Sequence, residues 1–198
     1  MRQQILWGER VSGASYPFPV ADLEKLPDDG YTYEVVEGVL IRMPGSGYDA
    51  SKIAALLIHL LLSFVIPRKL GDVTGADGTY DLTQPGATVE TALIPDVAFV
   101  QATRAPARNP GYAKLAPDLV AEVASPSQYR PEMNAKAQLY LERGVRLVWV
   151  LWPQRQEVDI CRPDSPQSPV ATLGIADSLN GFDILPGFAC PLADLFTA

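Results

Sequence analysis

One stretch constrains the fold of this chain more than any other: residues 117–127, which read Pro-Asp-Leu-Val-Ala-Glu-Val-Ala-Ser-Pro-Ser. Its apolar residues alternate in the manner of a β-strand, and Glu122 stands in the middle. Glu122 would share one face of that strand with Val120 and Ala124. Because an acid inside an apolar strand is costly to bury unless it is paired or binds a metal, the stretch predicts a functional or ion-paired carboxylate at Glu122.

A second acid occupies a similar position one strand earlier. The segment Ile94–Val100 is predicted to be a strand and contains Asp96. Strands that follow one another along the chain usually pair or lie close together, so the carboxylates of Asp96 and Glu122 are expected to converge. Oxygen ligands of this kind suit Mg²⁺ or Mn²⁺, which bind through one or two carboxylates, water and substrate phosphate.

The helix that follows would supply a positive charge. Pro131 and Gly144 are suited to the start and the end of a helix, and Lys136 lies between them. A divalent ion held by two carboxylates lowers the pKa of a bound water and stabilises charge on a phosphodiester. Lys136 would orient that water or neutralise the developing charge.

Simpler interpretations exist for each of these residues. Asp96 and Glu122 would each fit a strand end or sheet edge that faces solvent, and Lys136 would fit a solvated helix position. General acid and base work on sugars is another possible use of two carboxylates, but it leaves Lys136 without a role. His59 lies among the apolar residues of a predicted helix, which favours a core or rim residue over a ligand.

The remaining patterns predict an α/β (α+β) fold with a mixed central sheet flanked by helices. The expected order is an N-terminal β-hairpin, a helix, three strands, a helix, a strand and a second hairpin. The supporting segments are a hairpin at 31–43 around Glu37-Gly38, a helix capped by Asp49 or Ser51 that ends near Pro67, a strand at 73–82 with a turn or bulge at Asp77-Gly78, a loop at 101–116, a central strand at 145–152 and a strand at 157–162.

Length and composition predict one domain, 1–198, in which residues 1–20 form an arm. Only two cysteines are present and the sequence does not begin with a secretory signal, so a disulfide framework is not expected and the cytoplasm is the expected location. The longest apolar run, Ile53–Ile66, has 14 residues and is too short to span a bilayer.

The charge of the chain is unevenly distributed. A net charge of −7 argues against a protein that coats nucleic acid in general. Residues 101–150, however, hold 7 basic and 4 acidic residues, and this segment contains Glu122 and Lys136. That balance is compatible with a phosphate-bearing substrate at this segment, and ordinary variation in charge would explain it equally well.

Several blocks of sequence together carry a resemblance to a known family. They are Tyr-Glu-Val-Val-Glu-Gly-Val-Leu at 33–40, Pro-Asp-Val-Ala-Phe-Val at 95–100, the stretch 117–127, Lys136 with Tyr140 and Gly144-Val145, and Val-Trp-Val at 148–150. From about residue 20 to the end, the chain resembles the Uma-type restriction endonuclease family of the PD-(D/E)XK nuclease superfamily. The resemblance implies a restriction-endonuclease-like core of helix, three-strand meander, helix and strand.

The same resemblance implies an activity and a site. The implied function is a Mg²⁺-dependent (or Mn²⁺-dependent) endonuclease that hydrolyses DNA, and a homodimer is the assembly expected with it. Asp96 and Glu122 would be the metal ligands and catalytic acids, Lys136 the catalytic lysine, and Glu34 of the first hairpin a further member of the site.

Two positions depart from the pattern of the family and its superfamily. Ala124 stands where the superfamily places a lysine, so Lys136 would have to reach the site from the next helix. Ala50 stands roughly where the family often has a histidine. The alternative is therefore a catalytically weak or inactive nuclease-like scaffold that binds nucleic acid or a protein partner.

Overall fold

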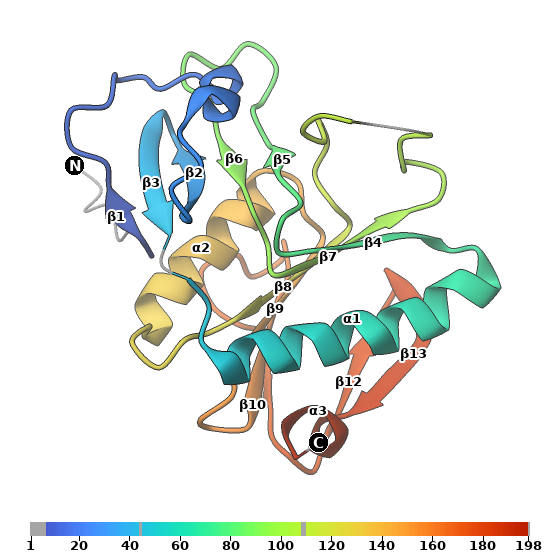
Figure 1. Ribbon diagram of the computed structural model, residues 1–198. Helices are drawn as coiled ribbons and strands as arrows, with labels where there is room; N and C mark the ends of the chain where they lie inside the picture. The colour runs from blue at the N-terminus through green and yellow to red at the C-terminus, as the bar shows by residue number, and fades with distance from the viewer. Residues whose placement is uncertain (1–6, 44, 108–109, 198) are drawn as a thin grey trace.

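The computed structural model describes residues 7–43, 45–107 and 110–197 (Figure 1). Two sheets, one hairpin and four helical segments make up the described fold. The helices are η1 (Val20–Lys25, a 3₁₀ helix), α1 (Tyr48–Arg68), α2 (Arg130–Glu142) and α3 (Leu192–Phe196). The strands are β1 (Glu9–Arg10), β2 (Thr32–Val36), β3 (Val39–Met43), β4 (Gly71–Gly75), β5 (Tyr80–Asp81), β6 (Ala92–Leu93), β7 (Val97–Gln101), β8 (Leu119–Val123), β9 (Leu147–Trp152), β10 (Glu157–Cys161), β11 (Ala171–Leu173), β12 (Ser178–Gly181) and β13 (Leu185–Pro191).

The larger sheet contains the predicted core. Its six strands lie in the order β11-β10-β9-β8-β7-β4. Strands β4, β7 and β8 pair antiparallel as a meander, and β9 then pairs parallel to β8 after the crossover through α2. The order of helix, three-strand meander, helix and strand is thus confirmed, and so is the α+β fold class. Because β9 is flanked by strands on both edges and buried throughout, it reads as an uninterrupted apolar run.

The smaller sheet departs from the prediction. The hairpin β2–β3 is present, and Glu37 and Gly38 take φ values of 48° and 77°, as a tight two-residue hairpin turn requires. It does not stand alone, however, because β1, β6 and β5 extend it to a five-stranded sheet. The predicted arm therefore contributes strand β1, while residues 1–6 lie outside the described part of the chain.

One predicted strand segment is divided between the two sheets at its predicted turn, and a second predicted strand begins later than expected. The segment 73–82 turns at Gly78, whose N–H donates to the carbonyl of Gly75 at 3.0 Å, so β4 belongs to the large sheet and β5 to the small one. In the segment Ile94–Val100 the strand itself, β7, starts only at Val97, because Pro95 has no N–H to donate to a neighbouring strand. Asp96 consequently lies at the point where the chain enters the large sheet.

Helices cover the two faces of the large sheet. On one face α1, β12, β13 and α3 pack against Leu119, Ala121 and Val123 of β8. On the other face α2 and the hairpin β2–β3 pack against Val120 and Ala124, so α2 lies between the two sheets (Figure 1). The predicted alternation of β8 is therefore confirmed, and Glu122 is on the face that α2 covers.

Helix α1 is longer and more apolar than its central run suggested. It has 21 residues with a mean hydropathy of 1.9, so by length and composition alone it is long enough to cross a membrane. One side of it packs in the core of the fold, as helices of water-soluble proteins also do. The expected side-chain cap is wrong, since Gly47 is the N-cap and no side chain caps the helix. His59 is exposed on its outer side, and the buried Cys161 and Cys190 are both free.

Candidate active site

The pairing of β7 with β8 brings the two predicted acids together. Val97 lies opposite Ala121 in an antiparallel register, and extending that register by one residue sets Asp96 opposite Glu122. Side chains that lie directly opposite in an antiparallel pair point to the same face. The backbone N–H of Val123 donates to Asp96 Oδ2 at 2.7 Å, which fixes the first carboxylate beside the second.

Lys136 reaches this pair from α2. Its Nζ lies 2.9 Å from Oε1 of Glu122, and the lysine side chain is only 3% exposed. Tyr140, one helical turn further on, donates its hydroxyl to the same Oε1 at 2.7 Å. A spacing of four residues places both side chains on one face of α2. The lysine that is absent at Ala124 is thus replaced in space by one from the neighbouring helix.

Glu34 joins the group from β2 and is completely buried. Its Oε1 accepts from the backbone N–H of Ile94 at 2.9 Å and lies 3.3 Å from Nζ of Lys136. Its Oε2 accepts from the indole Nε1–H of Trp7 at 2.6 Å. Both oxygens of Glu34 are therefore engaged with the protein, and this carboxylate links the small sheet to α2.

The structure thus gathers all four residues that the sequence singled out, and it adds two that the sequence did not. Tyr140 follows Lys136 by four residues, so the spacing alone places it on the same helical face. Trp7 lies in the predicted arm, where no periodicity pointed to a buried residue. Only the three-dimensional contact with Glu34 identifies it.

Burial dominates the electrostatics of the cluster. Desolvation raises the pKa of Glu122 to about 8 against the opposing pull of the Lys136 ammonium, and desolvation also raises the pKa of Asp96. Desolvation by itself would lower the pKa of Lys136, but the carboxylates of Glu122 and Glu34 outweigh it, so that pKa lies above its usual value. Lys136 is therefore positively charged at neutral pH. Its single positive charge faces three acidic groups, Glu34, Asp96 and Glu122.

The cluster forms one wall of a pocket of about 400 Å³. Asp96, Glu122 and Lys136 line it, together with Ala50 from the start of α1. A histidine at that position, as the family often has, would therefore face the same pocket. The alanine leaves the described wall of the pocket without an imidazole.

The residues present fit a divalent cation in one specific way. Among the described residues, no side chain or backbone N–H donates to Oδ1 of Asp96 or to Oε2 of Glu122, so each carboxylate keeps an oxygen open. Three carboxyl groups lie around a single ammonium group, and burial raises the pKa of both Asp96 and Glu122, so a bound cation would stabilise their ionised forms. Within the described ranges, however, no three His, Cys, Asp or Glu side chains are arranged to hold a metal without help. Two carboxylates supplemented by water and phosphate oxygens are the coordination that Mg²⁺ favours.

The fold and the pocket together define a nuclease-like α+β domain. In agreement with this, the sequence matches the family described as "Uma2: Putative restriction endonuclease" over residues 20–193. The chain belongs to this Uma2 family. The match leaves only the first 19 residues and the last 5 outside it.

A solved structure shares the fold. It is the crystal structure of a protein from Anabaena variabilis ATCC 29413 titled "a putative nuclease belonging to DUF820", which superposes with a TM-score of 0.74 at 21% sequence identity. The match covers 91% of this chain and 98% of that one. At this level of identity the likeness establishes the fold alone. No curated protein matches the sequence.

Proposed function

We propose that this protein is a Mg²⁺-dependent endonuclease, able to use Mn²⁺, that hydrolyses phosphodiester bonds in DNA. The observation that carries the proposal is the meeting of Asp96 and Glu122 at one pocket, each with an open carboxylate oxygen, beside the buried ammonium of Lys136. Membership of the Uma2 family supports the nuclease class. Asp96 and Glu122 would hold the ion.

Each residue has a distinct part in the proposed reaction. A bound divalent ion would supply a more acidic water and neutralise charge on the phosphate. Lys136, held beside Glu122, would place its positive charge near the scissile phosphate, where negative charge develops in the transition state. Glu34 and Tyr140 would act as positioning residues, because one contacts Lys136 and the other contacts Glu122.

The direct test is cleavage of single- and double-stranded DNA and RNA in the presence of Mg²⁺ or Mn²⁺. Wild-type protein is expected to cut DNA, and Glu122→Gln is expected to lower the rate by at least about 100-fold, the scale seen when a preorganised electrostatic group is removed. Glu157→Gln is the matched control, since Glu157 lies on β10 of the same sheet and pairs with Arg130. Cleavage by Glu122→Gln at the wild-type rate would contradict the proposed site.

A second function, a nuclease-like scaffold that binds nucleic acid or protein without cutting, is favoured by one observation. Ala50 lines the pocket at the position where the family often carries a histidine. Metal binding separates the two functions. A scaffold should show no Mn²⁺ affinity that depends on Asp96 and Glu122, whereas the nuclease should.

The proposal extends to assembly and location. A homodimer would bring two such sites to the two strands of a duplex, and the cytoplasm would give access to DNA. Light scattering coupled to size-exclusion chromatography tests the first point. A monomer that still cuts both strands would remove the need for a dimer.

A further inference from the structure

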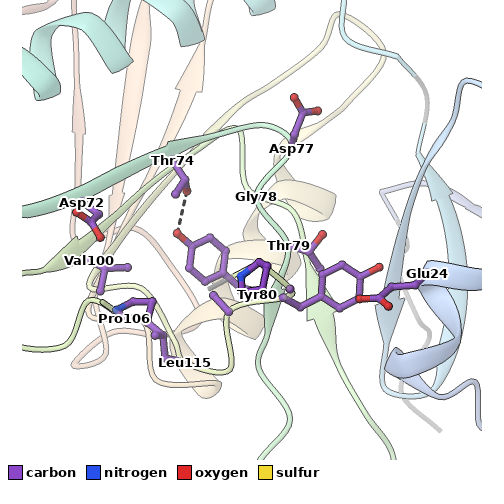
Figure 2. Close-up of a pocket in the computed structure, with 14 residues that line it drawn as sticks. Glu24, Asp72, Thr74, Asp77, Gly78, Thr79, Tyr80, Val100, Pro106 and Leu115 are labelled. Carbon is purple, nitrogen blue, oxygen red and sulfur yellow. Dashed lines mark hydrogen bonds between the residues drawn. The ribbon is translucent and has the colours of Figure 1, made fainter. Parts of the chain in front are cut away.

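A second pocket, of about 440 Å³, lies around the ring of Tyr80 (Figure 2). We call it the Tyr80 pocket. The Tyr80 side chain is 2% exposed, and its hydroxyl forms a hydrogen bond of 2.8 Å with Oγ1 of Thr74, so the ring is held in place. Apolar groups form much of the remaining wall: Val100, Pro106, Pro110, Ala113 and Leu115. The size and the mixture of apolar and polar groups in the wall are typical of sites for small organic groups.

The Tyr80 pocket adjoins the candidate active site through one turn of the chain. Residues 76–79 connect β4 to β5, and Asp77 within this turn lines both pockets. Ala76 faces the active-site pocket, whereas Gly78 and Thr79 face the Tyr80 pocket. A substrate held at Asp96 and Glu122 therefore has the Tyr80 pocket within reach across a single turn.

Three acidic side chains line the Tyr80 pocket at its rim: Glu24, Asp72 and Asp77. Figure 2 shows Asp72 and Glu24 on opposite sides of Tyr80, with Asp77 at a third position above it. None of these three carboxylates pairs with another described residue, and none of the described lining residues is basic. These carboxylates are suited to accept hydrogen bonds from N–H groups.

We propose that the Tyr80 pocket binds one unpaired nucleobase of the substrate, adjacent to the phosphodiester that is cut, and that it prefers guanine. This inference rests on the proposed nuclease function and names the form of its substrate. A flat base matches a pocket lined by the partly exposed ring of Tyr112, because base–aromatic contact is favourable for every base. The carboxylates at the rim supply the selection among bases.

Guanine is preferred because of the donors on its Watson–Crick edge. Its N1–H and N2–H groups lie side by side, and a carboxylate accepts such a pair with both oxygens. Cytosine and adenine offer one amino group next to an acceptor. Thymine and uracil present carbonyl oxygens on both sides of a single N–H, and carboxylates repel these oxygens. Watson–Crick edges are hidden in a duplex, so the base must be single-stranded or flipped out to enter.

The first arm of the test measures binding without catalysis. Deoxyguanosine, deoxycytidine, deoxyadenosine and thymidine are titrated into metal-free protein and followed by NMR. Deoxyguanosine is expected to bind tightest, and the double variant Glu24→Gln/Asp72→Asn is expected to weaken it by at least about tenfold, as loss of charge-assisted hydrogen bonds does. Both side chains are exposed, so the fold is retained, and exposed Asp164→Asn serves as the control.

The second arm measures cleavage of single-stranded thymidine oligonucleotides that contain one guanine. Cuts are expected next to the guanine with wild-type protein, and at no preferred position with the double variant, while the total rate is retained. Guanine-selective binding without any cleavage would support the base pocket and sink the nuclease proposal. Equal or undetectable binding of the four nucleosides would overturn the pocket. Binding of agmatine at least as tight as that of deoxyguanosine would also overturn it, in favour of a cationic side chain as the occupant.

Discussion

Two groups of buried acids lie on the same six-stranded sheet, and they differ in how their charge is balanced. Asp159 of β10 is completely buried, and both its oxygens accept from Arg130. The indole of Trp152 at 2.8 Å and the hydroxyl of Thr172 at 2.5 Å also donate to it. Each carboxylate oxygen of Asp159 thus accepts two hydrogen bonds, so neither oxygen is open to a ligand.

The group at the candidate active site has the opposite balance. One lysine faces Glu34, Asp96 and Glu122. Glu34 has donors on both oxygens, while Asp96 and Glu122 each keep one oxygen open within the described part of the chain. Burial alone therefore does not distinguish a structural acid from a functional one. The number of donors supplied to each carboxylate does.

The largest expected difference between the two groups is in stability. Arg130→Met would leave Asp159 buried without a cation, and removing one partner of a buried pair costs about 3–5 kcal/mol of unfolding free energy. Urea denaturation at pH 7 measures it. Glu122→Gln is the comparison, and it should leave stability nearly unchanged because burial already favours the neutral form of Glu122 at pH 7. If Arg130→Met proves no more destabilising than Glu122→Gln, the distinction between the groups fails.

A smaller effect is expected from the two tryptophans that donate to buried acids. Trp7→Phe would leave Oε2 of Glu34 without its indole donor, at a cost of about 1–3 kcal/mol. Trp152→Phe should cost less, because Arg130 still donates to the same oxygen of Asp159. Thermal and urea unfolding of the two variants measure this difference. Equal losses would mean that packing, and not donor supply, sets the role of Trp7.

The pH dependence of stability gives a gradual effect, with a slope of at most about 1.4 kcal/mol per pH unit. Burial raises the pKa of Glu122 from 4.5 to about 8, so within this window the folded protein holds a proton that the unfolded chain has lost. The contribution is present below pH 4.5 and is lost as the pH rises towards 8. Urea denaturation of metal-free protein across this range should show a falling stability. The slope should be shallower in Glu122→Gln, and an unchanged slope in that variant would refute the assignment.

Much of this arrangement could be predicted from sequence because it depends on local periodicity. The alternation around Glu122 gives the face of β8, and the spacing of Lys136 and Tyr140 gives a shared face of α2. The order of strands follows from short connections along the chain. These features require no knowledge of distant contacts, and the structure has all of them.

The remainder depends on contacts between segments far apart in sequence. Pro117-Asp118 and Pro95-Asp96 look alike as dipeptides, yet Asp118 is bound by Arg104 and by the backbone N–H of Gln101. No local pattern carries that difference. The burial of Trp7 against Glu34 and the addition of β5 and β6 to the first hairpin depend in the same way on the assembled fold.

The central claim is that Asp96 and Glu122 hold a divalent cation through the oxygens that the protein leaves open. Isothermal titration of Mn²⁺ into wild-type protein, Glu122→Gln and Glu157→Gln at pH 8.5 tests it directly, at a pH chosen to lie above the raised pKa of Glu122, about 8. Mn²⁺ is expected to bind to the wild type and to Glu157→Gln, and this binding is expected to be lost in Glu122→Gln. Binding that is equal in all three proteins, or absent from the wild type, would contradict it.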